Sequence, residues 1–210
     1  MKYDLHVHSK YSIDGYVEPE EIVKTGIKRG LSGIAITDHD TIKGGLLAKK
    51  YQNKDFLVIV GSEITTNKGE IIGLFLNQEI RSKDHVEVMD DIKDQDGLVI
   101  IPHPFDTMRQ ATYHPQKNEL KYFDGVEVFN SRCISQRYND EAEAFANKFN
   151  LNHCAGSDAH FVNEIGNAGV ISRDELRKSL KNNQLEVFGK RSSLLNHGFT
   201  KIVKSYRRIK

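Results

Sequence analysis

The stretch YDLHVH, residues 3–8, is a short apolar strand that ends in two histidines. Residues two apart on a strand point to the same face, so His6 and His8 can reach one cation. By itself this pair is weak evidence for a metal site, because two surface histidines on a strand edge would show the same HxH pattern. It gains weight because the pattern, a buried strand followed by histidine or acid, returns along the chain.

Short apolar runs alternate with longer amphipathic segments over most of the sequence. We expect buried strands at residues 3–7, 33–36, 56–60, 71–76, 98–101, 125–129 and 153–155. Alternating strands and helices predict an α/β protein with parallel strands, either closed into a barrel or open and doubly wound.

Helix signals fall between these strands. Pro19 is typical of a first helical turn, and Gly30 is well placed to end that helix. Ser82 can cap a helix that runs toward Gln95. Ser172, with Glu175 three residues later, forms the pattern of a capping box for a helix toward Lys181.

Polar residues that follow one strand after another decide between the two architectures. No strand is followed by a GxGxxG or Walker pattern, which would favour an open nucleotide-binding sheet. In a barrel, the carboxyl ends of all parallel strands meet at one face, so these polar residues would converge. We therefore predict a barrel. The residues concerned are His6, His8, Asp38, His39, Glu63, His103, Asn130, Asp158 and His160.

Each of these motifs also has an ordinary explanation. Asp38 or Asp40 could cap a helix, and Glu63 could be an exposed loop residue. His103 lies between two prolines in a rigid extended turn, which is a good platform for a ligand. Together, five unrelated strand ends carrying histidine or acid are improbable. Imidazoles and carboxylates without thiolates suit zinc, manganese or iron in a catalytic site.

The composition sets broad limits. The 210 residues are 38% hydrophobic and 28% charged with a net charge of +1, as in ordinary globular proteins. The two cysteines form no CxxC pattern, and no apolar run resembles a signal peptide or a membrane span, so we expect a cytoplasmic protein without membrane association. The last residues form a basic tail that we expect to be solvated or frayed, with a phosphate or nucleic-acid contact as the alternative: Lys201, Lys204, Arg207, Arg208 and Lys210.

Five separated motifs resemble, in order, those of the polymerase and histidinol phosphatase (PHP) domain family of metal-dependent phosphoesterases. They are DLHVHSKYSIDG (4–15), ITDHDT (36–41), GSEITT (61–66), IIPHPFD (100–106) and AGSDAH (155–160). The resemblance implies a distorted (β/α)7 TIM-like barrel with two or three divalent metal ions at the C-terminal ends of the strands. We expect one domain over residues 1–210, with the motifs within 3–160 and C-terminal helices and the basic tail in 172–210.

The resemblance also implies a set of metal ligands. One metal would be held by His6, His8, Glu63 and Asp158. Glu63 would bridge to a second metal bound by His103, and Asp14, His39 and His160 would hold a third. The sequence departs from the family at two positions. Several members have histidine where this chain has Glu70, and some have histidine where it has Asn130.

The family activity implied is hydrolysis of a phosphate ester by a metal-activated hydroxide. The substrate would be a small phosphomonoester, a nucleotide or an oligonucleotide end, so a nucleic-acid partner stays open. We expect Asp158 or His160 to assist proton transfer to the leaving group. Arg109 and Arg132 are the predicted phosphate contacts, because a guanidinium offers a bidentate fork; both could instead be solvent-exposed loop arginines.

Two other classes of function stay open. A metal-dependent, amidohydrolase-like enzyme would attack a carbon centre, although the sequence shows no obvious lysine at a strand end to form a carbamylated metal bridge. A non-catalytic metal-binding PHP module would stabilise or recruit a partner, although every principal metal motif is present here.

Overall fold

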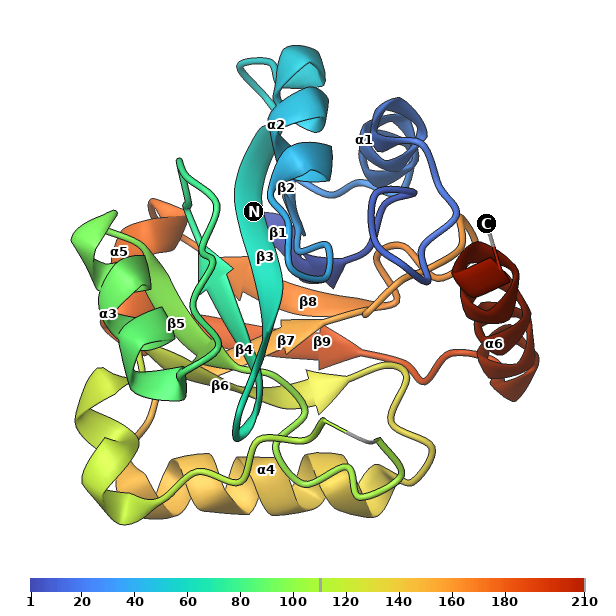
Figure 1. The fold of residues 1–210 in the computed structure, drawn as a ribbon. Helices are drawn as coiled ribbons and strands as arrows, with labels where there is room; N and C mark the ends of the chain where they lie inside the picture. The colour runs from blue at the N-terminus through green and yellow to red at the C-terminus, as the bar shows by residue number, and fades with distance from the viewer. Residues whose placement is uncertain (110, 210) are drawn as a thin grey trace.

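The computed structural model of the protein describes residues 1–109 and 111–209. In this part of the chain a nine-stranded sheet has the order β7-β6-β5-β4-β3-β2-β1-β8-β9 and curls into a nearly closed barrel (Figure 1). Its strands are β1 (Lys2–Val7), β2 (Gly33–Ile36), β3 (Leu57–Thr66), β4 (Gly69–Leu74), β5 (Leu98–Ile101), β6 (Gly125–Asn130), β7 (His153–Gly156), β8 (Ala168–Ser172) and β9 (Leu185–Gly189).

The two sides of the sheet meet between β1 and the segment that follows β7. The backbone N–H of Asp158 donates to the carbonyl of His6 at 2.7 Å, and that of His8 donates to the carbonyl of Ala159 at 2.8 Å. The first residues of β1 pair with β8 instead, which is why closure is incomplete. The predicted class, an α/β protein with a distorted TIM-like barrel, is confirmed.

The predicted strand at residues 71–76 exists but does not run parallel to its neighbours. β4 is antiparallel to both β3 and β5. Only Asn67 and Lys68 separate β3 from β4, and so short a connection allows a hairpin but no crossover. Reversal brings the start of β4, including Glu70, to the face where the parallel strands end.

The helices are α1 (Pro19–Lys28), α2 (Lys43–Ala48), α3 (His85–Asp94), α4 (Gln136–Phe149), α5 (Leu176–Lys181) and α6 (Leu194–Ile209), with 3-10 turns η1 (Lys49–Tyr51) and η2 (Lys117–Tyr122). α1 begins at Pro19 and is followed by Gly30 at a φ of 74°, as predicted. Two predicted caps are wrong. Asp84 caps α3 instead of Ser82, and Glu175 itself caps α5 while Ser172 ends β8.

Apolar side chains fill the barrel and the spaces between its wall and the helices. One cluster inside the barrel includes Leu5, Ile59 and Ile100. Other clusters lie where helices such as α3 and α4 cover the outside of the sheet (Figure 1). The described side chains of α6 belong to none of these clusters, although Phe199 makes an edge contact with Phe161. In the described part of the chain, no helix is both long enough and apolar enough to span a membrane.

Candidate metal centre

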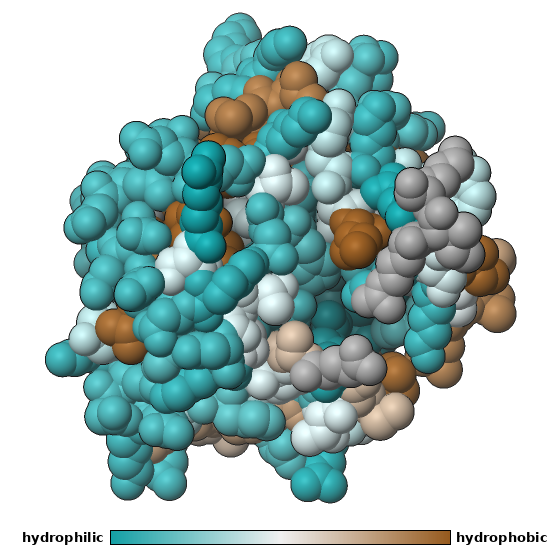
Figure 2. Space-filling model, viewed as in Figure 1, coloured by the Kyte–Doolittle hydropathy of each residue, from teal (hydrophilic) through white to brown (hydrophobic). Residues whose placement is uncertain are grey.

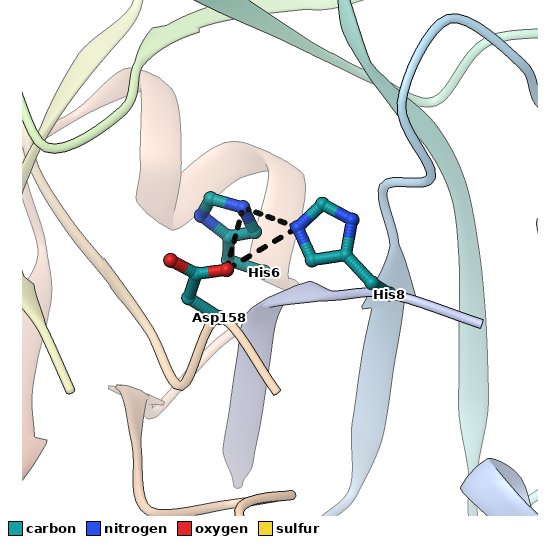
Figure 3. Close-up of side chains that lie close together, drawn as sticks. All are labelled: His6, His8 and Asp158. Carbon is teal, nitrogen blue, oxygen red and sulfur yellow. Dashed lines mark hydrogen bonds and ion pairs between the residues drawn. The ribbon is translucent and has the colours of Figure 1, made fainter. Parts of the chain in front are cut away.

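Two histidines of β1 and an aspartate that follows β7 meet at the closing seam of the barrel. His6 Nε2 lies 3.1 Å from His8 Nε2, and Asp158 Oδ1 lies 3.3 Å from His8 Nε2 and 3.7 Å from His6 Nε2. Figure 3 shows the three side chains pointing toward one another. The alternation of β1 places both imidazoles on one face, as the sequence predicts.

Glu63 joins this trio to a third histidine. β3 extends past the end of β2, so Glu63 lies over the carboxyl ends of the parallel strands. Its Oε2 is 3.2 Å from His6 Nε2 and 3.3 Å from His8 Nε2, while its Oε1 is 2.9 Å from His103 Nε2. One carboxylate therefore places its oxygens in two groups of candidate metal ligands.

A further group forms around Asp14 in the loop after β1. Its Oδ1 lies 3.3 Å from His160 Nε2, and its Oδ2 lies 3.3 Å from His39 Nε2. The other ring nitrogen of His39 is 3.5 Å from Glu63 Oε2. All eight predicted ligands therefore come together, in four overlapping sets of three: His6, His8 and Asp158; His6, Glu63 and His103; His8, His39 and Glu63; His8, Asp14 and His160.

Hydrogen bonds to the far side of each ring fix three imidazoles. His6 Nδ1 donates to Glu127 Oε1 at 3.0 Å, and His160 Nδ1 donates to the carbonyl of Asp158 at 2.8 Å. The Ser12 hydroxyl donates to Asp14, which leaves it to accept from His8 Nδ1 at 3.3 Å. Because Nδ1 is the hydrogen-bond donor in each case, Nε2 is the ring nitrogen that is left to bind a cation.

Two of the candidate ligands adopt a backbone conformation that side chains other than glycine rarely occupy. The φ angle is 30° at His103 and 54° at Asp158. Such residues persist where their surroundings fix them, and they cluster at functional sites. The N–H of His103 donates to Glu127 Oε2 at 2.9 Å, so one buried carboxylate orients both His6 and His103.

The ionised carboxylates of this cluster favour the binding of a cation. Burial alone would raise the pKa of Glu63 and of Asp158, but surrounding histidines, and Arg109 beside Asp158, hold both well below their ordinary values. Burial lowers the pKa of His39, yet Glu63 and Asp14 raise it to about 10. The carboxylates thus stay ionised and favour the protonated form of neighbouring histidines. A divalent ion can supply the same positive charge in place of those protons.

The side chains present fit a metal centre. Asp158 Oδ1 is buried and has no hydrogen-bond partner among the described residues, although it points at His6 and His8. The donor set is imidazole and carboxylate, and the buried free thiols Cys133 and Cys154 belong to none of the ligand sets. These donors suit zinc, manganese or iron.

A pocket of about 420 Å³ opens over the cluster. Its floor includes Asp14, His39, Asp158 and His160, and α6 forms part of its wall. Figure 2 shows a hollow on this face of the molecule, with hydrophilic residues inside it.

The two predicted phosphate-binding arginines both line this pocket but differ in how they are held. Arg109 Nη2 donates to Asp158 Oδ2 at 2.6 Å and Nε donates to Asp106, which leaves Nη1 without a hydrogen bond among the described residues. Arg132 is buried, and its Nη1 binds both oxygens of Glu164 at 2.8 and 2.9 Å. Arg109 is thus the better placed to bind a ligand.

The PHP domain profile matches residues 4–182. The chain belongs to the PHP domain family. An uncharacterized protein of Methanocaldococcus jannaschii is 44% identical over 144 residues, which cover 62% of this chain and 82% of that protein. A second uncharacterized protein of the same organism is 39% identical over 176 residues, covering 81% of this chain and 70% of its own length.

The fold agrees with this membership. A crystal structure of a two-domain protein of Bacteroides vulgatus that contains a predicted PHP-like metal-dependent phosphoesterase superposes with a TM-score of 0.77 at 23% identity. The match covers 90% of this chain and 65% of that protein. At this identity the likeness shows a shared fold.

Reasoning from sequence missed Glu127, which orients two candidate ligands of this PHP domain's site. Glu127 was assigned only to a strand, although an acid within an apolar run is the kind of signal that marks a buried partner. Glu70 lies 3.7 Å from His39 and 3.9 Å from His103, at one of the two positions that depart from the family pattern. Asn130, the other, donates to Asp158 Oδ2 at 3.2 Å and to Glu127.

The expectation of a solvated or frayed basic tail is wrong in part. The tail is not frayed, because Lys201, Lys204 and Arg207 belong to α6. Lys201 and Lys204 line the pocket. The side chain of Arg208 and the whole of Lys210 lie outside the described residues.

Proposed function

We propose that this PHP domain is a metal-dependent phosphoesterase that hydrolyses the phosphate ester of a small molecule, nucleotide or oligonucleotide end. One observation carries the proposal: the four ligand sets overlap in one cluster, and the members Asp14, His39, Asp158 and His160 line a pocket that Arg109 also lines. A cluster of this charge suits an anionic substrate only if cations occupy it, and bound divalent ions supply a nucleophilic hydroxide near neutral pH and neutralise phosphoryl charge.

The chain's own groups then hold and orient the substrate. Arg109 is fixed by Asp106 and Asp158, so its free Nη1 can donate to a non-bridging phosphate oxygen without reorganisation. Arg132 is bound to Glu164 and to Thr200 at 2.9 Å, which favours a role in shaping the pocket wall over direct contact.

Asp158 and His160 are better placed as ligands than as proton donors. Asp158 Oδ2 accepts from Arg109 and Asn130, and His160 Nδ1 is committed to a backbone carbonyl. Both remaining atoms, Asp158 Oδ1 and His160 Nε2, point into the ligand cluster. We therefore propose that the leaving group takes its proton from solvent in the pocket.

The test is release of phosphate or nitrophenol from generic mono- and diesters by protein reconstituted separately with manganese, zinc and iron. We expect metal-dependent turnover that is lost in His39→Ala and kept in His114→Ala, which removes an exposed histidine outside the pocket. Bound metal without turnover on any ester would contradict the phosphoesterase and favour a carbon-centred hydrolase or a binding module. Failure to bind metal would contradict the site itself.

A further inference from the structure

α6 presents its two faces in an unusual way. Apolar side chains on one face point to solvent; Leu195, Phe199 and Ile202 are 74%, 56% and 65% exposed. Brown atoms at the right-hand edge of Figure 2, where α6 lies in Figure 1, belong to this side. The opposite face, with His197, Lys201 and Lys204, lines the pocket. A helix on a globular protein normally buries its apolar face, whereas these side chains are mostly exposed and Phe199 makes an edge contact with Phe161, so burial of apolar surface contributes little to this orientation.

Polar contacts hold the helix in this position. Arg207 Nη1 donates to the carbonyls of Lys10 and Ser12, in the loop that carries Asp14. Near the middle of the helix, Arg132 Nη2 donates to Thr200 Oγ1 at 2.9 Å. α6 is therefore tied to the site from two sides.

The two lysines have no acid to neutralise them. Lys201 and Lys204 form no ion pair with any carboxylate in residues 1–109 and 111–209, whereas Arg109 and Arg132 in the same pocket are paired. Three helical residues span about 4.5 Å, so the ammonium groups project one turn apart along one wall. Together they can accept one doubly charged group.

We propose that this lysine pair binds a second phosphate group of the substrate, apart from the ester that is cleaved. The substrate class would be phosphate esters that carry another phosphate, either a small bisphosphate or the backbone of a nucleic-acid end. Metal ions and Arg109 suffice to neutralise the charge of the scissile phosphate. If the leaving alcohol were uncharged, both lysines would have no anionic group of the substrate to bind. The inference rests on the proposed function, and the lysines lie beyond the 4–182 segment that the PHP profile matches.

The experiment compares Lys201→Ala/Lys204→Ala with the wild-type metal-loaded protein on two matched substrate pairs. One pair is ribose 5-phosphate and ribose 1,5-bisphosphate; the other is adenosine 5′-monophosphate and 5′-phosphorylated diadenylate. The wild type should prefer the second compound of one pair, and that pair identifies the source of the second phosphate. In the double variant this preference in kcat/KM should fall about 10-fold, mainly through KM. Lys178→Ala, which removes an exposed lysine of α5, should keep it.

A second readout separates binding from mere support of the helix. The wild-type preference should shrink as salt is raised, because exposed charges are screened, and the double variant should show little of this dependence. Calorimetric titration with ribose 1,5-bisphosphate and with 5′-phosphorylated diadenylate measures binding without requiring turnover. Weaker binding to the double variant would support the inference even in a protein that hydrolyses neither pair. Equal binding, or an unchanged preference, would overturn it while leaving metal-dependent hydrolysis intact.

Discussion

The ligand cluster at the floor of the pocket and the α6 face on its wall are charged oppositely and held differently. Glu63 at the floor is 1% exposed, and buried neighbours such as Glu127 orient the ligands around it. Lys201 on the wall is exposed, and neither it nor Lys204 has a carboxylate partner among the described residues. Buried groups oriented by hydrogen bonds suit a small cation of fixed geometry, whereas long solvated side chains adapt to ligands of varied shape.

Of the predicted changes, Glu63→Gln should impair the ligand cluster at the floor of the pocket most severely. The substitution keeps the shape but removes the charge that faces His6, His8 and His103. We expect a loss of at least one bound ion and a fall in kcat of about 10³-fold or more, because the ions supply several kcal/mol of the barrier reduction. Metal analysis and esterase assays measure both.

Glu87→Gln is the matched control. It makes the same chemical change at an exposed position on α3. Full metal content in Glu63→Gln would show that Glu63 is no bridge.

Metal removal should have the next largest effect, on stability. Ions bound to the folded state at about 1,000 times their Kd stabilise it by about 4 kcal/mol, and chelation removes this while leaving buried carboxylates facing one another. For a chain of this size we expect Tm to fall by about 10 °C. Calorimetry with and without chelator measures the shift.

The double variant of the lysine pair is the control for this thermal unfolding experiment. Lys201→Ala/Lys204→Ala should melt as the wild type does and show the same chelator response. A drop in Tm for this variant without chelator would indicate that the wall is part of the folded framework.

Glu127→Gln tests how strictly the floor is oriented. Its Oε1 accepts from His6 and its Oε2 from the N–H of His103. An amide can replace only one of these acceptors, so we expect metal affinity or kcat to fall about 10- to 100-fold. Competition with a chelator of known affinity measures the first. An unchanged affinity would mean that Glu127 serves only to support β6.

The sequence predicted the floor much better than the wall, and the reason is physical. His6, His8, Glu63 and His103 follow or end short buried strands, so the local pattern and the barrel together specify where they converge. The direction of β4 depends on a two-residue turn, which outweighs the apolar pattern. The described apolar side chains of α6 belong to no core cluster, so no packing argument could have placed its lysines over the pocket.

Ile202→Ser sharpens the contrast with the smallest expected effect. The side chain is 65% exposed on the outer face of α6, so its replacement should change the free energy of unfolding by no more than about 0.5 kcal/mol. Ile59→Ser, inside the barrel, removes apolar contacts and buries a hydroxyl, and it should cost about 3 kcal/mol or more. Urea unfolding of the two variants measures both values. A cost above about 1 kcal/mol for Ile202→Ser would mean that the outer face of α6 is covered in solution, and the polar anchors at Arg132 and Arg207 would no longer explain alone why its cationic face turns toward the metal centre.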